Sequence, residues 1–213
     1  ELGYVKLNQV LSNSIDIKEF QYLSVNKYLK KLIFNKEKIY KILNEIFIKN
    51  DLKNCLTDIT GLNYSIDYFT AYETFPIDEI DRSKGWYANK LHRDKPFSNN
   101  TIKLIIPLED IDEDNGPMKI ADIELSKKIS LGSHQNENFY NFSGKNRDVF
   151  VFKPNLCFHV AGIPFEGKTR KQIMVQLNPS KAWKYNKKID EFQKIREPKF
   201  PFFSYFFEKK ELL

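Results

Sequence analysis

His92 and Asp94 place an imidazole and a carboxylate two positions apart in a chain that contains only three histidines. Side chains at positions i and i+2 of extended backbone point to the same face, so this short segment presents both groups together. They supply two ligands of a metal site, and the third must come from elsewhere in the chain. His159, in Asn-Leu-Cys-Phe-His-Val-Ala-Gly, is the candidate. A chain that uses these ligands has to fold so that two extended segments, far apart in sequence, meet at one point.

Two imidazoles and one carboxylate on one face of a metal leave three coordination positions open, which is the arrangement of non-haem Fe(II) oxygenases. A single His-x-Asp triplet is a weak signal, because a histidine near an aspartate is commonly an ordinary hydrogen-bonded pair. The residues after His159 strengthen it. The turn-forming residues 164–168 and their strand-like flanks predict a hairpin with His159 on one arm and Arg170 on the other.

In the preferred register of this hairpin, His159 lies opposite Gln172, and Arg170 shares the face of Gln172. A shift of one residue would turn Arg170 to the other side of the sheet. The preferred register therefore places a guanidinium beside the metal. A guanidinium is well shaped to hold a carboxylate through two parallel hydrogen bonds.

Together, His92, Asp94, His159 and Arg170 resemble the His-x-Asp, distal His and Arg set of the Fe(II)/2-oxoglutarate-dependent dioxygenases. The segment from Ile105 to Met118, Ile-Ile-Pro-Leu-Glu-Asp-Ile-Asp-Glu-Asp-Asn-Gly-Pro-Met, resembles the Leu-x-Asp-x-x-x-x-Asn-Gly-Pro-Leu signature of the phytanoyl-CoA dioxygenase family. The Pro-Gly-Ser-His of that family stands here after a longer gap, with Leu131 in place of the proline. The resemblance covers roughly residues 64–179 and does not identify the substrate.

The resemblance implies that Fe(II) binds to His92, Asp94 and His159. It also implies that 2-oxoglutarate fills two of the open positions with its far carboxylate on Arg170, and that O2 takes the last one. The expected reaction converts 2-oxoglutarate and O2 to succinate and CO2 and hydroxylates a small organic substrate. Related halogenases have a small residue in place of Asp94, so its presence favours hydroxylation or another oxidation. The family's histidine at the position of His134 is not a ligand.

Lys103 is the unusual residue of the predicted strand 101–108. A lysine among apolar strand residues either faces solvent or finds an anion, because an unpaired buried ammonium is costly. The family often places a polar residue near this position against 2-oxoglutarate. Lys103 is therefore a candidate contact for a cosubstrate or substrate carboxylate, and an exposed strand face is the alternative.

The predicted strands do not alternate regularly with helices, which favours a mostly β (α+β) fold with antiparallel pairing. The resemblance specifies this fold as a double-stranded β-helix, a jelly-roll or cupin-like architecture. We expect a single dioxygenase domain over residues 1–213, with an N-terminal helical layer (1–63), the β-helix core (64–179), and a C-terminal helix and aromatic tail (180–213). Strands are predicted at 4–7, 64–75, 101–108, 118–121 and 147–153. Apolar residues at helical spacing predict two helices between residues 17 and 50, the second beginning near Asn35.

Several loops are expected near the site. Residues 77–88 read as a loop at the pocket mouth, with Trp86 and Tyr87 as possible substrate contacts. The polar stretch 123–146, which contains His134, is a candidate lid. The resemblance also suggests that Tyr68, Ala71 or Tyr72 faces the cosubstrate or substrate, although each is an ordinary core candidate as well.

The amino-acid composition limits the classes of partner that we expect the chain to bind. The net charge of +6 and the pI of about 9.0 admit a nucleic-acid partner. Nucleic acid is disfavoured because lysine is abundant together with asparagine, isoleucine, phenylalanine and tyrosine, which indicates a compositional bias, and because the chain also has 28 acidic residues. The second arginine of nucleic-acid-repair dioxygenases is also replaced by Gln176.

The chain has no apolar run long enough for a membrane span and opens without a signal-peptide pattern. Two cysteines without framework spacing suggest free thiols and a cytoplasmic protein. The protein is expected to be a monomer or a homodimer. The alternatives left open are a non-catalytic cupin-like binding module and, less favoured, a nucleic-acid-directed dioxygenase.

Overall fold

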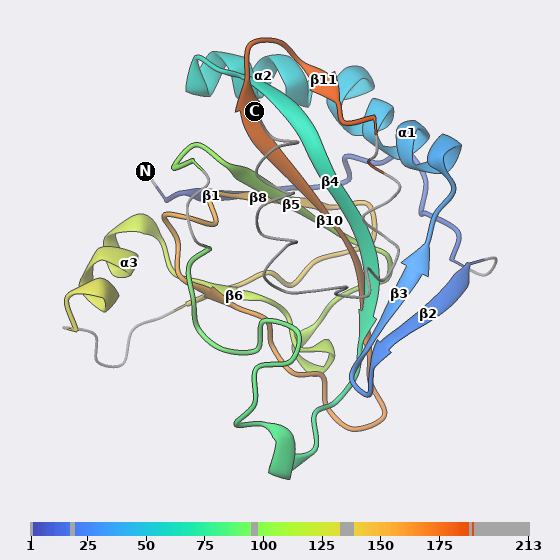
Figure 1. Ribbon diagram of the computed structural model, residues 1–213, viewed down its shortest axis with the longest axis vertical. Coiled ribbons are helices and arrows are strands. Elements are labelled where there is room, and N and C mark those ends of the chain that lie inside the picture. The colour runs from blue at the N-terminus through green and yellow to red at the C-terminus, as the bar shows by residue number, and fades with distance from the viewer. Residues whose placement is uncertain (1, 18–19, 95–97, 133–138, 188, 190–213) are drawn as a thin grey trace, which may run out of the picture.

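The computed structural model describes residues 2–17, 20–94, 98–132, 139–187 and 189. Its main element is a large, mostly antiparallel sheet with the strand order β1-β8-β5-β10-β4-β3-β2, and β11 pairs in parallel with β4. The two longest strands, β4 and β10, run side by side through the centre (Figure 1). The bounds of the strands are β1 Tyr4–Leu7, β2 Gln21–Asn26, β3 Leu29–Ile33, β4 Asn63–Thr74, β5 Ile102–Pro107, β8 Val149–Phe152, β10 Arg170–Ser180 and β11 Lys184–Tyr185.

A smaller antiparallel sheet has the order β7-β6-β9, with β6 at Lys119–Ile120, β7 at Tyr140–Asn141 and β9 at His159–Val160. Helices α1 (Lys36–Asn44) and α2 (Leu52–Thr60), joined by a π-helical segment Glu45–Lys49, lie along the top of the molecule in Figure 1. A third helix, α3 (Ile123–Ser130), lies to the side near β6, and short 3-10 turns occupy Glu79–Asp81 and Glu113–Asn115. The predicted mostly β, antiparallel architecture is thus confirmed as a β-sandwich-like fold.

Alternation along β10 separates two hydrophobic cores. Ile173, Val175 and Leu177 pack into the larger core, which also contains Ile39 and Leu43 of α1. Met174, on the opposite face of β10, packs against the smaller core. This smaller core combines residues of the large sheet with residues of the β6 region: Ile105, Met118, Ile120, Phe142, Phe150, Phe152 and Cys157. The large sheet therefore has a helix-covered face and an inner face that meets the second sheet.

The predicted first helix between residues 17 and 50 is wrong, because β2 and β3 form a hairpin there. The side chain of Asn26 accepts a hydrogen bond from the backbone N–H of Tyr28 (2.8 Å), which fixes a turn at the point where a helix would have to continue. β3 then adds to the large sheet, with Leu32 opposite Ala71. The second predicted helix is confirmed: Asn35 caps α1 by accepting from the backbone N–H of Lys38. The segment 1–63 is therefore a helical layer only in its second half.

The predicted hairpin of His159 and Arg170 is also wrong. His159 pairs in the small sheet with Ile120, whereas Arg170 begins β10 of the large sheet, where Gln172 lies opposite Tyr72 and Pro107. The intervening residues 161–169 carry the chain from one sheet to the other. The turn itself is present, with the backbone N–H of Lys168 donating to the carbonyl of Phe165.

The candidate lid at 123–146 begins with a regular helix instead of an irregular loop. Asp122 caps α3 by accepting from the backbone N–H of Leu125 (2.7 Å), and Leu125 faces the interior. An aspartate immediately before an apolar-containing helical turn is a start signal. His134 lies outside the described residues, and so do residues 188 and 190–213, which make up most of the segment expected to form the C-terminal helix and aromatic tail. The other predicted strands match the observed ones closely.

Candidate metal centre

Three backbone segments meet where the predicted ligands lie. The backbone N–H of His92 donates to the carbonyl of His159 (3.0 Å), and the N–H of His159 donates to the carbonyl of His92 (2.8 Å). His92 thus extends the small sheet beyond β9 through an antiparallel bridge. The backbone N–H of Asp94 donates to the carbonyl of Pro154 (3.1 Å), which fastens the end of this segment.

The side chains of His92, Asp94 and His159 converge. Oδ1 of Asp94 lies 3.6 Å from Nε2 of His92 and 3.7 Å from Nε2 of His159. One ligand atom from each of the three residues lies within 4.8 Å of the others. Such a group of two nitrogens and one carboxylate oxygen has the spacing and donor chemistry to hold a transition-metal ion and leave further coordination positions open.

Both imidazoles are oriented by the same kind of hydrogen bond. Nδ1 of His92 lies 2.7 Å from the carbonyl of Lys90, and Nδ1 of His159 lies 3.0 Å from the carbonyl of Cys157. Because a carbonyl oxygen only accepts, Nδ1 of each ring carries a proton, which leaves Nε2, the atom nearer Asp94, as the nitrogen that could ligate a metal. The i, i+2 reasoning from sequence predicted that the His92 and Asp94 side chains lie together but missed these carbonyls.

His159 is the more enclosed of the two histidines. Its side chain is 6% exposed, compared with 35% for His92, and the edge of the Phe152 ring packs against it. Burial lowers the pKa of His159 from 6.5 to about 4. The ring is therefore neutral at physiological pH, as a metal ligand must be.

Lys103 supplies a cation to the same cluster. Its Nζ lies 2.5 Å from Oδ2 of Asp94, and its side chain is 13% exposed. In the sheet register Lys103 lies opposite Phe152 on one side and Gln176 on the other. The predicted exposed-face alternative is therefore excluded, and the anion that this lysine contacts is Asp94.

Arg170 is fully enclosed at the start of β10, with 1% of its surface exposed. Its Nη1 donates to the carbonyl oxygens of Gly116 and Gly162, the latter at 3.0 Å. Its Nε is buried and has no hydrogen-bond partner among the described residues. Arg170 thus joins the Asn115-Gly116-Pro117 turn to the segment that follows His159, and it keeps one unused buried donor.

Tyr72 lies close enough to Arg170 for the two groups to influence each other's pKa. Burial raises the pKa of Tyr72, and the charge of Arg170 opposes this effect. The amide of Gln172 donates to the Tyr72 hydroxyl (2.6 Å). Of the three residues suggested on this strand, Ala71 belongs to the helix-side core, whereas Tyr72 lies on the inner face.

The loop residues Trp86 and Tyr87 have structural partners. The indole N–H of Trp86 donates to the carbonyl of Asp81 (3.2 Å), and its ring packs edge-on against Tyr28. The Tyr87 hydroxyl donates to the carbonyl of Phe75 (2.8 Å). These contacts order the loop that leads from β4 to His92.

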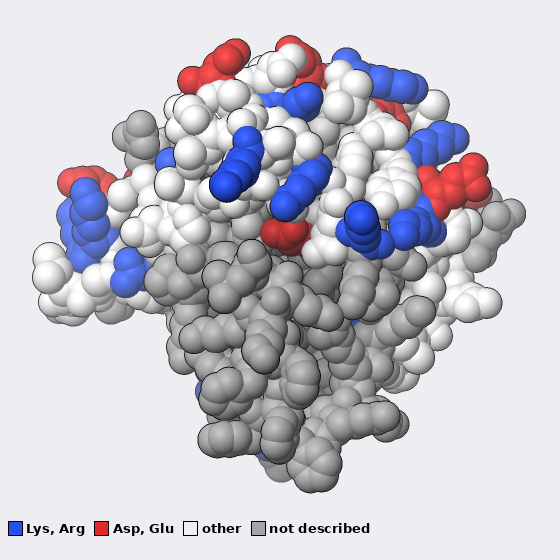
Figure 2. Space-filling model, turned by 45° about the horizontal axis from the view of Figure 1, so that its top comes forward, with Lys and Arg blue, Asp and Glu red and all other residues white. Residues whose placement is uncertain are grey.

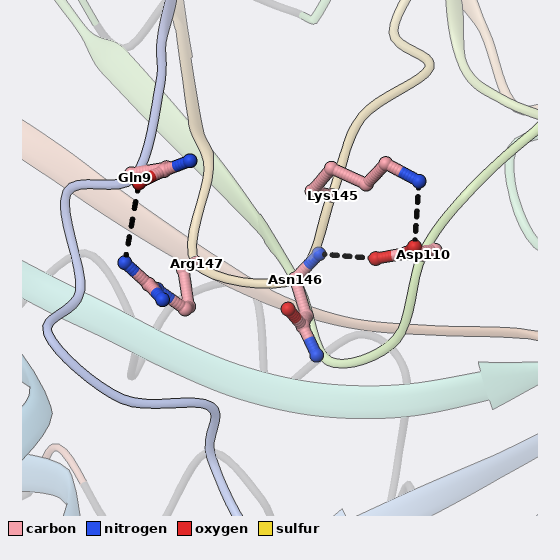
Figure 3. Close-up of a pocket in the computed structure, with 5 residues that line it drawn as sticks. All are labelled: Gln9, Asp110, Lys145, Asn146 and Arg147. Atoms are coloured by element: carbon pink, nitrogen blue, oxygen red, sulfur yellow. Dashed lines mark hydrogen bonds and ion pairs between the residues drawn. The ribbon is translucent and has the colours of Figure 1, made fainter.

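A surface hollow of about 230 Å³ lies elsewhere, lined by Gln9, Asp110, Lys145, Asn146 and Arg147 (Figure 3). Its polar groups satisfy one another: Nζ of Lys145 lies 2.8 Å from Asp110, which also accepts from the backbone N–H of Asn146. These residues precede β8, whereas His159 follows it. The residues that line the hollow do not include His92, Asp94 or His159.

The surface charge is mixed. Figure 2 shows lysine and arginine side chains spread across the upper face of the molecule, with acidic side chains among them. None of the helices in the described residues is both long and apolar enough to cross a membrane.

Comparison with known proteins shows a shared fold. The structure is similar to that of the non-heme alpha-ketoglutarate-dependent epimerase SnoN from nogalamycin biosynthesis, with a TM-score of 0.56, 12% sequence identity, and coverage of 83% of this chain and 77% of SnoN. It is also similar to the carbocyclase SnoK of the same biosynthesis (TM-score 0.52, 12% identity, 83% and 79% coverage). HygX from Streptomyces hygroscopicus, with nickel and 2-oxoglutarate bound, gives a TM-score of 0.51 at 8% identity, with 84% of each chain covered.

No family model and no curated protein sequence matches the chain. The sequence identities to the similar structures are low, so the likeness concerns the fold. The chain shares the overall architecture of these 2-oxoglutarate-dependent enzymes.

Proposed function

We propose that the protein is a non-haem Fe(II)/2-oxoglutarate-dependent oxygenase with a double-stranded β-helix core, most similar in its motifs to the phytanoyl-CoA dioxygenase family. The observation that carries this proposal is the convergence of His92, Asp94 and His159, with both Nε2 atoms turned toward one carboxylate oxygen. Two neutral imidazoles and a carboxylate are the donor set of Fe(II) sites that activate O2.

Two hydrogen-bond donors on the inner face support a site for an acceptor-rich group. The buried Nε–H of Arg170 has no acceptor among the described residues, and the Tyr72 hydroxyl, which accepts from Gln172, retains its own proton for donation. Two such donors near each other favour a carboxylate. We propose that Arg170, assisted by Tyr72, holds the far carboxylate of 2-oxoglutarate.

A ferrous ion bound with 2-oxoglutarate would activate O2, which is the oxidant: one oxygen atom would enter succinate as CO2 is released, and the other would enter a substrate C–H bond. The chain contributes the binding and orientation. His92, Asp94 and His159 hold the metal, and the carbonyls of Lys90 and Cys157 keep both rings in the ligating tautomer. The inner core beside Phe152 limits water on one side of His159.

We propose a small organic substrate. HygX has been crystallised with hygromycin B, SnoN with nogalamycin RO, and SnoK is a carbocyclase from nogalamycin biosynthesis. The molecules bound to these similar proteins favour a small molecule over a macromolecule as the substrate. Hydroxylation is the proposed outcome, and product analysis distinguishes it from epimerisation or ring closure.

Anaerobic titration tests the proposal. Wild-type protein should bind Fe(II) and then 2-oxoglutarate, with the visible charge-transfer absorbance of a ferrous 2-oxo acid chelate. His92→Ala should lose the metal. Arg170→Lys, which retains a cation for the two glycine carbonyls, should bind metal normally and 2-oxoglutarate at least roughly tenfold more weakly. Undiminished metal binding by His92→Ala would remove the proposed site.

A further inference from the structure

We propose that Lys103 is a positioning residue that holds Asp94 in a monodentate orientation toward the metal. This inference deepens the proposed function and rests on it, because it concerns how the same metal centre keeps its coordination positions open. The Asp94 carboxylate, the ammonium of Lys103 and the two imidazoles carry the argument.

The two oxygens of Asp94 have different neighbours. Oδ1 lies between the Nε2 atoms of His92 and His159, at 3.6 and 3.7 Å, whereas Oδ2 lies 2.5 Å from Nζ of Lys103. The ammonium therefore occupies the side of the carboxylate that faces away from the imidazoles. An ion pair at this distance restricts the orientation of the carboxylate plane.

Lys103 is placed to exert this control. It lies within β5, paired on one side with β8 and on the other with β10, so its backbone is fixed. Its side chain is 13% exposed, and Phe152 and Gln176 are its cross-strand neighbours. The ammonium thus projects from the interior of a sheet, where fewer alternative positions are open to it than to a surface lysine.

The orientation matters because carboxylates bind cations through one oxygen or through both. A bidentate Asp94 would take one of the positions that a chelating 2-oxo acid and O2 need. By occupying Oδ2, Lys103 leaves Oδ1 as the ligand and keeps three positions open. Groups that orient metal ligands in this way typically change metal affinity or activity by 10- to 100-fold when they are removed.

The test compares Lys103→Met, Lys103→Arg and the control Lys171→Met. Lys171 is another partly buried lysine in ion pairs, with Nζ 3.0 Å from Glu109 and 3.5 Å from Glu73, and neither acid belongs to the metal centre. The first readout is the ligand-field absorption of the cobalt(II)-loaded protein, which reports coordination number without any cosubstrate. The second is the dissociation constant of 2-oxoglutarate and of pyruvate on the anaerobic Fe(II)-loaded protein.

Lys103→Met should retain the metal, change the cobalt spectrum, and weaken 2-oxoglutarate and pyruvate by a similar factor of roughly ten or more. Lys103→Arg should restore both readouts, and Lys171→Met should match wild type. Pyruvate is informative because it has the chelating end but lacks the far carboxylate.

Two results would overturn the inference. Loss of 2-oxoglutarate affinity alone, with an unchanged cobalt spectrum, would make Lys103 a contact of the far carboxylate. If Lys103→Met had the cobalt spectrum and the 2-oxo acid affinities of wild type, the Lys103–Asp94 ion pair would have no role in orienting the carboxylate. If wild type binds cobalt but neither 2-oxo acid, the proposed function fails, and the cobalt spectra alone then decide the role of Lys103.

Discussion

At the scale of single residues, the protonation of the metal centre is set by backbone carbonyls and by burial. The carbonyls of Lys90 and Cys157 accept hydrogen bonds from the Nδ1–H groups of His92 and His159. Burial beside Phe152 keeps His159 neutral. A neutral imidazole with a free Nε2 lone pair needs no proton loss before it ligates a metal. In the proposed metal centre, these groups orient and enclose the ligand side chains without being ligands themselves.

This enclosure has a consequence for acid stability. Because the pKa of His159 falls from 6.5 to about 4 on folding, the unfolded chain binds more protons at this ring between those two pH values. The neutral His159 ring therefore makes its full contribution to the free energy of unfolding above pH 6.5. This contribution decreases as the pH falls toward 4, by an amount on the order of 3 kcal/mol. Urea unfolding of metal-free wild type should show this loss, and His159→Gln should lack it. An NMR titration that places the His159 pKa near 6.5 would contradict the account.

At the scale of elements, Arg170 and two glycines join the two sheets. Arg170 donates to the carbonyls of Gly116 and Gly162, and these glycines lie in close backbone contact. A Cβ built on Gly116 would lie 2.5 Å from the carbonyl carbon of Ile163, and one on Gly162 would lie 2.5 Å from the carbonyl oxygen of Pro117. The Asn115-Gly116-Pro117 turn is therefore part of the framework around the proposed cosubstrate site.

We expect Gly116→Ala to be strongly destabilising. Gly116 has φ +65, and Gly61, at φ +70, has no atom within 4 Å of the position of an added Cβ. Gly61→Ala is thus a matched control for backbone strain without the clash. Gly116→Ala should lower the free energy of unfolding by about 1–3 kcal/mol more than Gly61→Ala, measured by urea denaturation. Equal losses in the two variants would show that the close approach is readily relieved.

At the scale of the whole molecule, the large sheet separates a helix-covered core from the core that borders the metal centre. The N-terminal strand β1 closes one edge of this sheet by pairing with β8. Asp148, immediately before β8, is buried and accepts from the backbone N–H groups of Gln9 and Lys145, and it lies 3.2 Å from Lys6. A single carboxylate therefore ties the N-terminal segment to the strand that leads toward His159.

Removal of that carboxylate should loosen the edge of the sheet. Asp148→Ala leaves two backbone donors without their acceptor, so the free energy of unfolding should fall by about 2–3 kcal/mol. Asp110→Ala is the control, because the exposed Asp110–Lys145 pair contributes little and water can replace Asp110 as the acceptor of the exposed Asn146 N–H. Hydrogen exchange should quicken at β1 and β8 in Asp148→Ala alone. Unchanged exchange at these strands would contradict the proposed tie.

The sequence revealed those parts of this arrangement that depend on local spacing. His92 and Asp94 share a face because they are two residues apart, Asn35 marks the start of α1, and the strands at 4–7, 64–75 and 101–108 have the expected residue types. These features can be predicted without knowing which strands pair in the sheets.

Long-range pairing could not be read in the same way. The apolar residues between 20 and 33 suit either a helix or a hairpin, and the pairing of Leu32 with Ala71 decides the outcome. His159 and Arg170 entered different sheets because β9 pairs with Ile120 and β10 with β4 and β5. The contact of Lys103 with Asp94 likewise depends on how β5 is registered against β8.

We propose that His92, Asp94 and His159 form a metal centre at which O2 reacts with 2-oxoglutarate. The most direct measurement is succinate release after anaerobically iron-loaded protein with 2-oxoglutarate is exposed to O2, in wild type and in Asp94→Ala. Slow succinate formation by wild type, abolished in Asp94→Ala, is the predicted result. If wild type bound 2-oxoglutarate but formed no succinate with or without candidate substrates, the chain would be a binding module. Equal succinate formation by both proteins would contradict the assignment of the metal centre.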